Sequence, residues 1–312
     1  MHVALFLPAR LPVKRYGGVE RVVVWLARGL AELGHQVTLL AAPGSEVPEA
    51  TLVAVDPGAS AKPGFDLGRL LPAGVDIVHA HRPVAAPKGL PLVWTHHGNT
   101  RADQIDQLPG AMICLSANHA GRHHTNAFVY NGLDLAEYPP GTARGDFDLF
   151  LGRLHTARGY AWALEGARRT GHRLVVAGGW RPSLRRDLRY AGEVGDPEKI
   201  RLLGEARCLW APAQWDEPFG LPLIEALACG TPVLATLRGA HPEIVTPDTG
   251  ALGESLEDLV ALRPRLDAVD PAVCRSRVER HFSHRAMAAE YLRFYEAMIR
   301  DGVLPAGRVA GM

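Results

Sequence analysis

Glu217 and Glu225 are the residues of this sequence whose type and surroundings first indicate chemistry. Glu217 lies in a loop after a predicted strand at Cys208–Ala211, and Glu225 lies about one turn inside a predicted helix at Leu221–Ala228. In an open α/β sheet, a loop that leads from a strand into a helix lies at the carboxyl edge, where ligands bind. A carboxylate can accept hydrogen bonds from two hydroxyl groups at once, so vicinal diols of a ribose or a hexose are natural partners. The two glutamates therefore predict a site for an elongated, hydroxyl-rich ligand.

The start of the same helix is suited to binding an anion. Free backbone N–H groups at a helix N-terminus favour a phosphate, and Gly220 lets the backbone approach a ligand closely. The alternative is that Glu217 only stabilises the helix N-terminus and that Glu225 is a solvated helix residue. The residues around Glu225 are apolar, which argues against the solvated alternative: Leu223, Ile224, Ala226 and Leu227.

The elements that must position these glutamates follow an alternation of strands and helices. In the first half, an apolar run at Val3–Pro8 is followed by a glycine turn, an amphipathic helical stripe that ends at Gly34, and a second strand at Gln36–Ala41. This is a βαβ unit, which predicts a parallel sheet with a right-handed crossover. Further short apolar runs predict buried parallel strands at Thr51–Val55, Val75–Ala80, Leu92–Thr95, Met112–Leu115 and Phe128–Tyr130.

Proline and glycine concentrate at Glu137–Gly145, where the periodicity stops, so this segment is the predicted linker between two domains. The alternation then restarts, with predicted strands or helices at Asp148–Leu151, Ala157–Thr170, Arg173–Ala177, Pro197–Ala206, Cys208–Ala211, Leu221–Ala228 and Pro232–Ala235. We predict the α/β fold class with two Rossmann-like domains, at residues 1–143 and 144–283, followed by a final helix at Ala286–Arg300.

The composition agrees with a two-domain protein that has no strong overall charge. The 312 residues suit two domains, and 47% of them are hydrophobic. A net charge of +1 gives no field that would attract nucleic acid or a membrane surface. The N-terminal segment is typical of a first strand and not of a signal peptide, and no apolar stretch reaches the roughly 18 residues of a spanning helix. We predict a cytoplasmic protein with reduced, buried cysteines: Cys114, Cys208, Cys229 and Cys274.

The segment from Glu217 to Ala235 resembles the signature of the large family of retaining glycosyltransferases with the GT-B fold, which contains a spaced pair of glutamates. Other segments resemble family motifs in the expected order: Tyr16–Glu20, Asp76–His81, Thr95–Gly98, Tyr130–Asp134, Phe150–Leu154, Arg158-Gly159, His241–Val245 and Thr249-Gly250. The resemblance spans almost the whole chain. It implies an N-terminal acceptor-binding domain and a C-terminal donor-binding domain that face a central cleft, with the final helix packed back on the N-terminal domain.

The resemblance assigns catalytic roles to four residues. Arg153 and Arg158 would hold the donor diphosphate and stabilise the departing nucleoside diphosphate, which is electrostatic catalysis on a leaving group. The family usually has Lys at the second position, so a planar guanidinium replaces a point charge here. The alternative for both arginines is a solvated helix start. Glu217 would hold the transferred sugar, and His97 would point into the cleft near it, with a strand-end histidine bonded to the backbone as the alternative.

Further residues would bind the nucleotide part of the donor. Glu225 would bind the ribose hydroxyls, and Glu193 with Val194 would lie at the nucleobase edge. The first glycine turn, Gly17 and Gly18, would close the diphosphate site from the opposite domain. Backbone N–H groups would assist Glu217 in holding the sugar, at Phe219, Gly220 and Leu221.

Three pairs of histidines raise the question of a metal site: His79 and His81, His96 and His97, His123 and His124. No cysteine or carboxylate accompanies them at ligand spacing, and no DxD-like pair of carboxylates ends a strand. The resemblance also implies transfer without a metal ion. We therefore expect neither a metal nor a cofactor, with the nucleoside-diphosphate sugar as co-substrate.

The resulting hypothesis is a hexosyltransferase that moves a sugar to an acceptor hydroxyl by same-face attack and retains the anomeric configuration. The alternatives are a nucleotide-sugar epimerase or an inverting GT-B transferase, and a non-catalytic nucleotide-sugar binding protein. The expected acceptor is a small molecule, a saccharide or a lipid-linked hydroxyl, with a soluble acceptor favoured, at most weak peripheral membrane contact and no nucleic acid. Acceptor loops are expected at Leu11–Tyr16 and Asn99–Gln104. Ala240 replaces a glycine of the family's turn, which predicts a different local turn there.

Overall fold

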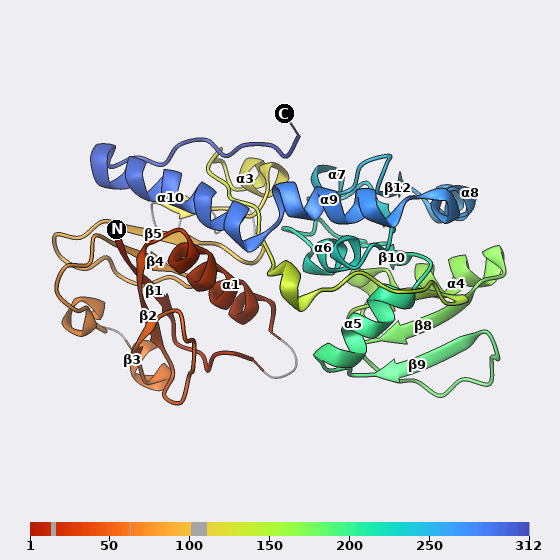
Figure 1. The fold of residues 1–312 in the computed structure, drawn as a ribbon, viewed down its shortest axis with the longest axis horizontal. Helices are drawn as coiled ribbons and strands as arrows, with labels where there is room; N and C mark the ends of the chain where they lie inside the picture. The colour runs from red at the N-terminus through yellow and green to blue at the C-terminus, as the bar shows by residue number, and fades with distance from the viewer. Residues whose placement is uncertain (14–16, 63, 101–110, 312) are drawn as a thin grey trace. The chain divides into compact units, whose positions relative to one another are not determined.

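The computed structural model describes residues 1–13, 17–62, 64–100 and 111–311, and these residues form two compact units (Figure 1). The first unit contains Met1–Leu133 and Ser283–Ala310, and the second contains Asp134–Phe282 together with Gly311. The first unit is therefore built from two separate stretches of the chain. Its boundary at Leu133 lies before the predicted boundary at residue 143.

A six-stranded parallel sheet forms the centre of the first unit, in the order β3-β2-β1-β4-β5-β6. Because β1 and β4 are neighbours, the strand order reverses between them, and this is where ligands bind in such sheets. The predicted strand at Phe128–Tyr130 makes only an isolated bridge, from Phe128 to Cys114. The strands are β1 (His2–Leu7), β2 (Gln36–Ala41), β3 (Thr51–Ala54), β4 (Ile77–Ala80), β5 (Leu92–Thr95) and β6 (Met112–Ile113).

Two long helices pack on each other in this unit, α1 (Gly18–Glu32) and α10 (His284–Asp301). Helix α1 buries one apolar stripe because its hydrophobic residues recur at helical spacing. Helix α10 buries Tyr291 and Tyr295, and their hydroxyl groups reach the sheet at Thr95 and His79. The shorter helices are α2 (Pro57–Ser60), η1 (Leu67–Leu70) and α3 (Ala117–Arg122).

The second unit repeats the architecture with a sheet in the order β12-β11-β10-β7-β8-β9. Numbered within its own unit and followed from β9, this is the strand order of the first sheet. The strands are β7 (Phe147–Leu151), β8 (Arg173–Ala177), β9 (Leu188–Gly192), β10 (Leu209–Ala211), β11 (Val233–Thr236) and β12 (Gly250–Gly253). The helices are η3 (Leu135–Glu137), η4 (Thr156–Arg158), α4 (Tyr160–Thr170), α5 (Asp196–Glu205), α6 (Leu221–Ala228), α7 (His241–Ile244), α8 (Leu256–Leu262), η5 (Arg263–Ala268) and α9 (Pro271–His281).

The predicted linker, Glu137–Gly145, is packed into the second unit. Tyr138 is 1% exposed, and backbone hydrogen bonds join Gly141 to Cys229 (3.0 Å) and Gly145 to Glu205 (2.6 Å). Tyr138 is the buried residue of this segment, whereas residues 139–145 are exposed, as expected of a linker. This packing explains why the unit boundary lies before it.

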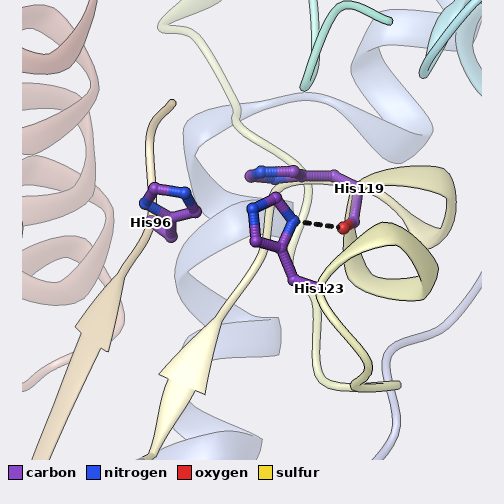
Figure 2. A group of neighbouring side chains, drawn as sticks. All are labelled: His96, His119 and His123. Atoms are coloured by element: carbon purple, nitrogen blue, oxygen red, sulfur yellow. Dashed lines mark hydrogen bonds between the residues drawn. The ribbon is translucent and has the colours of Figure 1, made fainter. Parts of the chain in front are cut away.

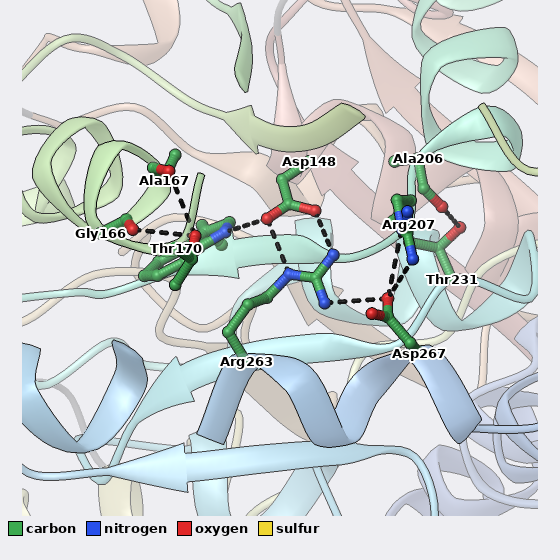
Figure 3. Close-up of polar contacts among 10 residues, drawn as sticks. Asp148, Gly166, Ala167, Thr170, Ala206, Arg207, Thr231, Arg263 and Asp267 are labelled. Carbon is green, nitrogen blue, oxygen red and sulfur yellow. Dashed lines mark hydrogen bonds and ion pairs between the residues drawn. The ribbon is translucent and has the colours of Figure 1, made fainter. Parts of the chain in front are cut away.

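A buried ion pair ties η5 to the central strand β7 of the second unit (Figure 3). The Arg263 guanidinium donates to both carboxylate oxygens of Asp148, at 2.6 and 2.8 Å, and Trp210 Nε1 donates to the same carboxylate at 2.9 Å. A third contact joins Arg263 to Asp267 at 3.0 Å. Both side chains of the pair are fully buried, so the charges depend on each other.

The four cysteines are free and buried, as predicted. Among the helices that the structure describes, none combines the length and the apolar character needed to cross a membrane.

Candidate functional site

A pocket lies at the carboxyl ends of β7 and β10, where the strand order of the second sheet reverses. Its polar lining consists of Arg158, Glu217 and His241, and Gly220 contributes backbone. The remaining lining is mostly apolar and comes from the two strands and from the start of α6. The fold therefore places a cation, a carboxylate and an imidazole at the position where α/β sheets bind their ligands.

Arg158 is held in this pocket by a close approach between two loops. The 3₁₀ turn η4 ends at Arg158, and Gly159 follows with a φ of 70°. A side chain at Gly159 would overlap the carbonyl group of Pro212, so only glycine fits. The backbone N–H of Gln214 also donates to Ala157 at 2.8 Å. The turn that carries Arg158 is thus fixed against the loop that leads to Glu217.

Arg158 and Glu217 form an ion pair, with Arg158 Nη1 donating to Glu217 Oε2. The Glu217 side chain is 10% exposed, and burial raises its pKa while the charge of Arg158 opposes the rise. The guanidinium also lies over the ring of Trp215, with 5.3 Å to the ring centroid. The predicted phosphate-binding and sugar-binding residues therefore share one site.

A tight turn fixes the backbone of Glu217 from the opposite side. Gly239 has a φ of 56°, and a side chain there would overlap the backbone of Glu217. The N–H of Ala240 donates to the Glu217 carbonyl at 3.0 Å. Ala240 itself has a φ of −80°, so the alanine that departs from the family motif occupies an ordinary right-handed conformation. Gly239 takes the left-handed position of this turn.

The N-terminus of α6 supplies free backbone donors next to Glu217. Gly220 caps the helix and no side chain caps it. Within the described part of the chain, the N–H groups of Gly220 and Leu221 have no hydrogen-bond partner. Phe219 is buried and packs against Phe282 with 6.0 Å between ring centroids. Two donors and the helix dipole thus favour an anionic or strongly polar group here.

Glu225 belongs to a second polar cluster, away from the residues that line this pocket. Its Oε1 accepts from Tyr138 Oη at 2.6 Å and from Lys199 Nζ at 2.7 Å. Lys199 also lies 3.0 Å from Tyr138 Oη and 3.3 Å from Asp196. Glu225 is 5% exposed, so the solvated alternative is wrong. The ammonium group of Lys199 compensates the buried negative charge of Glu225.

Sequence reasoning missed Tyr138 and Lys199. Tyr138 lies within the predicted linker and contacts Glu225 across 87 positions of the chain. Lys199 is one of the few lysines in a sequence whose basic residues are nearly all arginine, and this rarity was the available signal.

The other predicted donor residues of the second unit lie on loops at its surface. Arg153 is exposed and follows β7, and Glu193 is exposed and follows β9. Val194 is half-buried between β9 and α5. The loop that carries Glu193 and Val194 leads directly into α5, the helix that places Lys199 against Glu225.

The remaining predicted residues belong to the first unit. Gly17 caps α1 and Gly18 is its exposed first residue. His97 follows β5, and its Nε2 lies 2.9 Å from Nδ1 of His81. Desolvation lowers the pKa of His97 to about 3, so the imidazole is neutral near neutral pH. The bond to His81 differs from the expected alternative of a bond to the backbone.

Parts of the two predicted acceptor loops lie outside the described residues, namely 14–16 and 101–104. Among the residues that are described, one group of three histidines has the spacing of possible metal ligands: His96, His119 and His123, with ligand atoms within 4.8 Å of one another (Figure 2). His119 lies on α3 and His123, four positions later, is the residue that caps its C-terminus, a spacing that the adjacent pair at 123 and 124 obscured.

Comparisons with known proteins concern the family and the fold of the chain. The family model described as glycosyl transferases group 1 matches residues 149–261, and the model for glycosyltransferase family 4 matches residues 16–137. The chain is 29% identical over 315 aligned positions to a phosphatidyl-myo-inositol mannosyltransferase of Propionibacterium freudenreichii subsp. shermanii, covering 82% of each protein.

Two solved structures show the same fold. The first is AviGT4, a glycosyltransferase involved in avilamycin A biosynthesis, with a TM-score of 0.79, 28% identity, and coverage of 96% of this chain and 98% of that one. The second is the Anabaena protein Alr3699/HepE in complex with UDP-glucose, with a TM-score of 0.68, 14% identity, and coverage of 95% and 100%. The two family models match consecutive α/β units of this chain. The chain belongs to the group 1 glycosyltransferases, with the two Rossmann-like domains of the GT-B fold.

Proposed function

We propose that this glycosyltransferase moves a sugar from a nucleoside-diphosphate sugar to an acceptor hydroxyl, with retention of the anomeric configuration and without a metal ion. The observation that carries the proposal is the Arg158–Glu217 pair beside the free N–H groups of α6. It combines a fixed cation for phosphate, a carboxylate for hydroxyls and backbone donors in one pocket.

Arg158 would bind the diphosphate and stabilise it as it leaves. Only Nη1 of its guanidinium is engaged by a hydrogen bond in the described part of the chain, so the remaining N–H groups can reach phosphate oxygens. A positive charge at the leaving group acts on negative charge that develops in the transition state. Arg153, exposed on the preceding loop, would add a second cation.

Glu217 would orient the transferred sugar. One of its oxygens, Oε2, is held by Arg158, which leaves Oε1 to accept from a sugar hydroxyl. Glu225 would bind the ribose in a similar way, because Tyr138 and Lys199 occupy Oε1 and leave Oε2. Glu193 and Val194 would contact the nucleobase, while His97, Gly17 and Gly18 of the first unit would complete the donor site. Neither glutamate acts as a nucleophile in this scheme.

The chemical step would then be attack by the acceptor hydroxyl on the face that the phosphate leaves. A donor phosphate oxygen takes the hydroxyl proton, and the bond between the anomeric carbon and the phosphate oxygen breaks as the new glycosidic bond forms. This scheme needs no carboxylate beneath the sugar, unlike that of retaining hydrolases. The pocket residues supply binding, orientation and charge stabilisation.

For the donor, we propose a guanosine-linked mannose first. The support is the similarity to the phosphatidyl-myo-inositol mannosyltransferase, and to a Mycobacterium tuberculosis protein named as GDP-mannose-dependent that is 33% identical over 114 residues. The acceptor class stays a small molecule, a saccharide or a lipid-linked hydroxyl.

A thermal-shift panel of nucleoside diphosphates and nucleotide sugars tests the donor. A ligand at about 100 times its Kd stabilises the folded state by about 2.7 kcal/mol, so the preferred donor raises the Tm the most. GDP-mannose is expected to exceed UDP-glucose and free mannose. Equal shifts for all nucleotides would refute the choice of donor. A Glu217→Ala variant should lose the extra shift of the sugar and keep that of the nucleoside diphosphate.

Product analysis tests the reaction. NMR of the product should show the anomeric configuration of the donor, and an inverted product would refute same-face attack. Activity should persist in excess EDTA, and loss of activity that Mg²⁺ restores would refute transfer without a metal ion. Incubation with donor alone should leave its sugar unchanged, because an epimerised donor would favour the epimerase alternative.

A further inference from the structure

The cluster of His96, His119 and His123 lies beside the segment that carries His97, and the proposed transferase scheme does not use it. In Figure 2 His119 belongs to α3, His123 follows the last residue of that helix, and His96 follows the end of β5. The ring centroids are 4.5 to 5.3 Å apart. His119 is fully buried and His123 is 3% exposed. Three imidazoles so close together either bind a metal ion or hold part of the chain by hydrogen bonds.

Backbone groups fix the tautomer of His119. The N–H of Leu115 can only donate, and it lies 3.1 Å from His119 Nδ1, so this nitrogen is an acceptor without a proton. The carbonyl of Gly98 can only accept, and it lies 2.8 Å from His119 Nε2, so this nitrogen carries the proton. The contact with Leu115 excludes a proton on Nδ1 and the contact with Gly98 places one on Nε2, so together they define one neutral tautomer.

Backbone groups fix the opposite tautomer in His123. Its Nδ1 lies 2.9 Å from the carbonyl of His119 and must donate. Its Nε2 lies 3.3 Å from the N–H of Thr100 and must accept. His96 reaches the same residue, with its Nε2 2.9 Å from Thr100 Oγ1.

These contacts oppose a metal ion at the cluster. A metal bound to His119 Nε2 would displace the proton, and a proton on Nδ1 would then face the N–H of Leu115. The lone pair of His123 Nε2 is directed at Thr100. Protonation is opposed for the same geometric reason, and burial lowers the pKa of His119 to about 3 and that of His96 to about 4. His119 and His123 are therefore neutral, and the lone pair of each ring is engaged by a backbone N–H.

All three rings contact the short segment around His97. His119 holds Gly98, while His123 and His96 hold Thr100. On the other side, His81 holds Nε2 of His97. In the part of the chain that the structure describes, Nδ1 of His97 has no hydrogen-bond partner and stays available to a ligand.

We propose that His96, His119 and His123 form a neutral histidine clamp that fixes residues 98–100 and thereby positions the imidazole of His97 for a hydroxyl group of the donor sugar. The clamp residues are positioning residues, because they act through His97 and touch no substrate. The role of His97 toward the sugar rests on the proposed function, whereas the hydrogen bonds of the clamp do not.

Long-range ¹H–¹⁵N NMR of the imidazole rings tests the clamp without any substrate. Near pH 7, His119 should carry its proton on Nε2 and His123 on Nδ1, and the pKa of both rings should lie below the usual value for histidine. The opposite tautomer in either ring would overturn the clamp. A zinc titration should leave both signals unchanged, and a stoichiometric shift of all three rings would identify a metal site instead.

Asparagine variants distinguish the hydrogen bonds to residues 98–100 from the other contacts of each histidine. In His119→Asn the side-chain oxygen can still accept from Leu115, and in His123→Asn the amide can still donate to the carbonyl of His119, while each loses its contact to residues 98–100. The ring signals of His97 should move in both variants. They should not move in the control His124→Asn, whose histidine is exposed on the same turn and has a φ of 55° that asparagine tolerates. Unchanged His97 signals in the clamp variants would overturn the positioning role.

Turnover of GDP-mannose, or of the donor that the thermal-shift panel selects, tests the consequence. Each clamp variant should lower kcat/KM about threefold to tenfold, the size of one lost hydrogen bond. In a His97→Ala background the same substitutions should change kcat/KM less than twofold. An equal loss in both backgrounds would show a purely structural role and overturn the proposal. No turnover by the wild-type protein would refute the proposed function, and the NMR measurements would still decide the clamp.

Discussion

The two units of this protein share one strand order but bury different polar groups. In the first unit, His79 lies between Tyr295 and Thr95 at 2.6 and 2.7 Å, and Thr95 meets Tyr291 at 2.8 Å. All of these groups are neutral. In the second unit, the buried polar groups are charged, because Asp148 and Arg263 form a fully buried ion pair. The charged pairs of Arg158 and Lys199 lie nearer its ligand-binding edge.

This difference shows that one architecture can be stabilised by two kinds of buried polar contact. Burying neutral polar groups costs less desolvation free energy than burying charges. Hydroxyl and neutral imidazole groups can both donate and accept hydrogen bonds. A charged network is costly to bury but can stabilise a diphosphate. The His79 network and the Asp148–Arg263 pair are fully buried and stabilise their own units, whereas Arg158 lines the pocket proposed for the anionic donor.

Removing one partner of the buried ion pair should give the largest effect on stability. In Arg263→Met the Asp148 carboxylate is left buried without its partner, so the free energy of unfolding should fall by about 3–5 kcal/mol. Urea denaturation of the two proteins measures this loss. The control is Arg173→Met, which breaks the exposed pair with Asp146 and should cost about 0–1 kcal/mol. Similar losses of unfolding free energy in both variants would show that burial of the ion pair is not the cause.

Removing the cation of the pocket should give the next largest effect, on activity. Arg158→Ala should lower kcat by about 10²–10³-fold, because a fixed charge on the leaving group is lost. Arg158→Lys keeps the charge without the planar fork and should recover part of the activity. Steady-state kinetics with the preferred donor measure both. Arg169→Ala, which removes an exposed surface pair with Glu257, should leave kcat unchanged, and a comparable loss there would contradict the assignment.

The neutral interior of the first unit should make it sensitive to acid. Burial lowers the pKa of His79 to about 3, below its unfolded value near 6.5, so the unfolded state takes up a proton first as the pH falls. Stability from this group is complete above pH 6.5 and is lost between pH 6.5 and 3, by about 2 kcal/mol at pH 5. When the pH is lowered from 7.5 to 5, the free energy of unfolding of His79→Gln should therefore fall by about 2 kcal/mol less than that of the wild type. Urea denaturation at the two pH values measures this difference.

The control for this prediction is the exposed His124. A His124→Gln variant should keep the pH dependence of the wild type. If His79→Gln also keeps it, the acid sensitivity belongs to other groups.

The smallest predicted effect concerns the tyrosine that holds Glu225. Tyr138→Phe removes one hydrogen bond to the carboxylate and should weaken nucleoside-diphosphate binding about fivefold, with little change in kcat. Isothermal titration calorimetry measures the Kd. Tyr295→Phe makes the same chemical change in the first unit, where the hydroxyl contacts His79, and should lower stability without changing that Kd. If both variants weakened nucleoside-diphosphate binding equally, Tyr138 would have no role in binding that Tyr295 lacks.

Local pattern was enough to predict much of the second unit around the pocket. The helix predicted at Leu221–Ala228 is α6, and the strand predicted at Arg173–Ala177 is β8. The helix predicted at Ala157–Thr170 is divided by Gly159 into η4 and α4, because Gly159 has a left-handed conformation that ends the first turn. The strands β9 and β12 escaped prediction, since β12 begins and ends with glycine and β9 is an only partly buried edge strand.

The partners of the candidate residues depend on contacts between distant parts of the chain. Arg158 and Glu217 are 59 positions apart, and only their resemblance to a family motif suggested a common site. Tyr138 reaches Glu225 because this one residue of the predicted linker is buried in the second unit, while residues 139–145 are exposed. The histidine clamp depends on where α3 meets the end of β5. Periodicity and composition describe the segments themselves and contain no information on such pairs.

The divided first unit has a consequence for how the protein is made. During synthesis the ribosome completes residues 134–282 before it reaches α10. Until that helix emerges, the hydroxyl groups of Tyr291 and Tyr295 are missing from the first sheet, and α1 lacks its neighbouring helix. The unit whose synthesis begins first therefore completes its hydrogen bonds only after residues 134–282 of the second unit have been added.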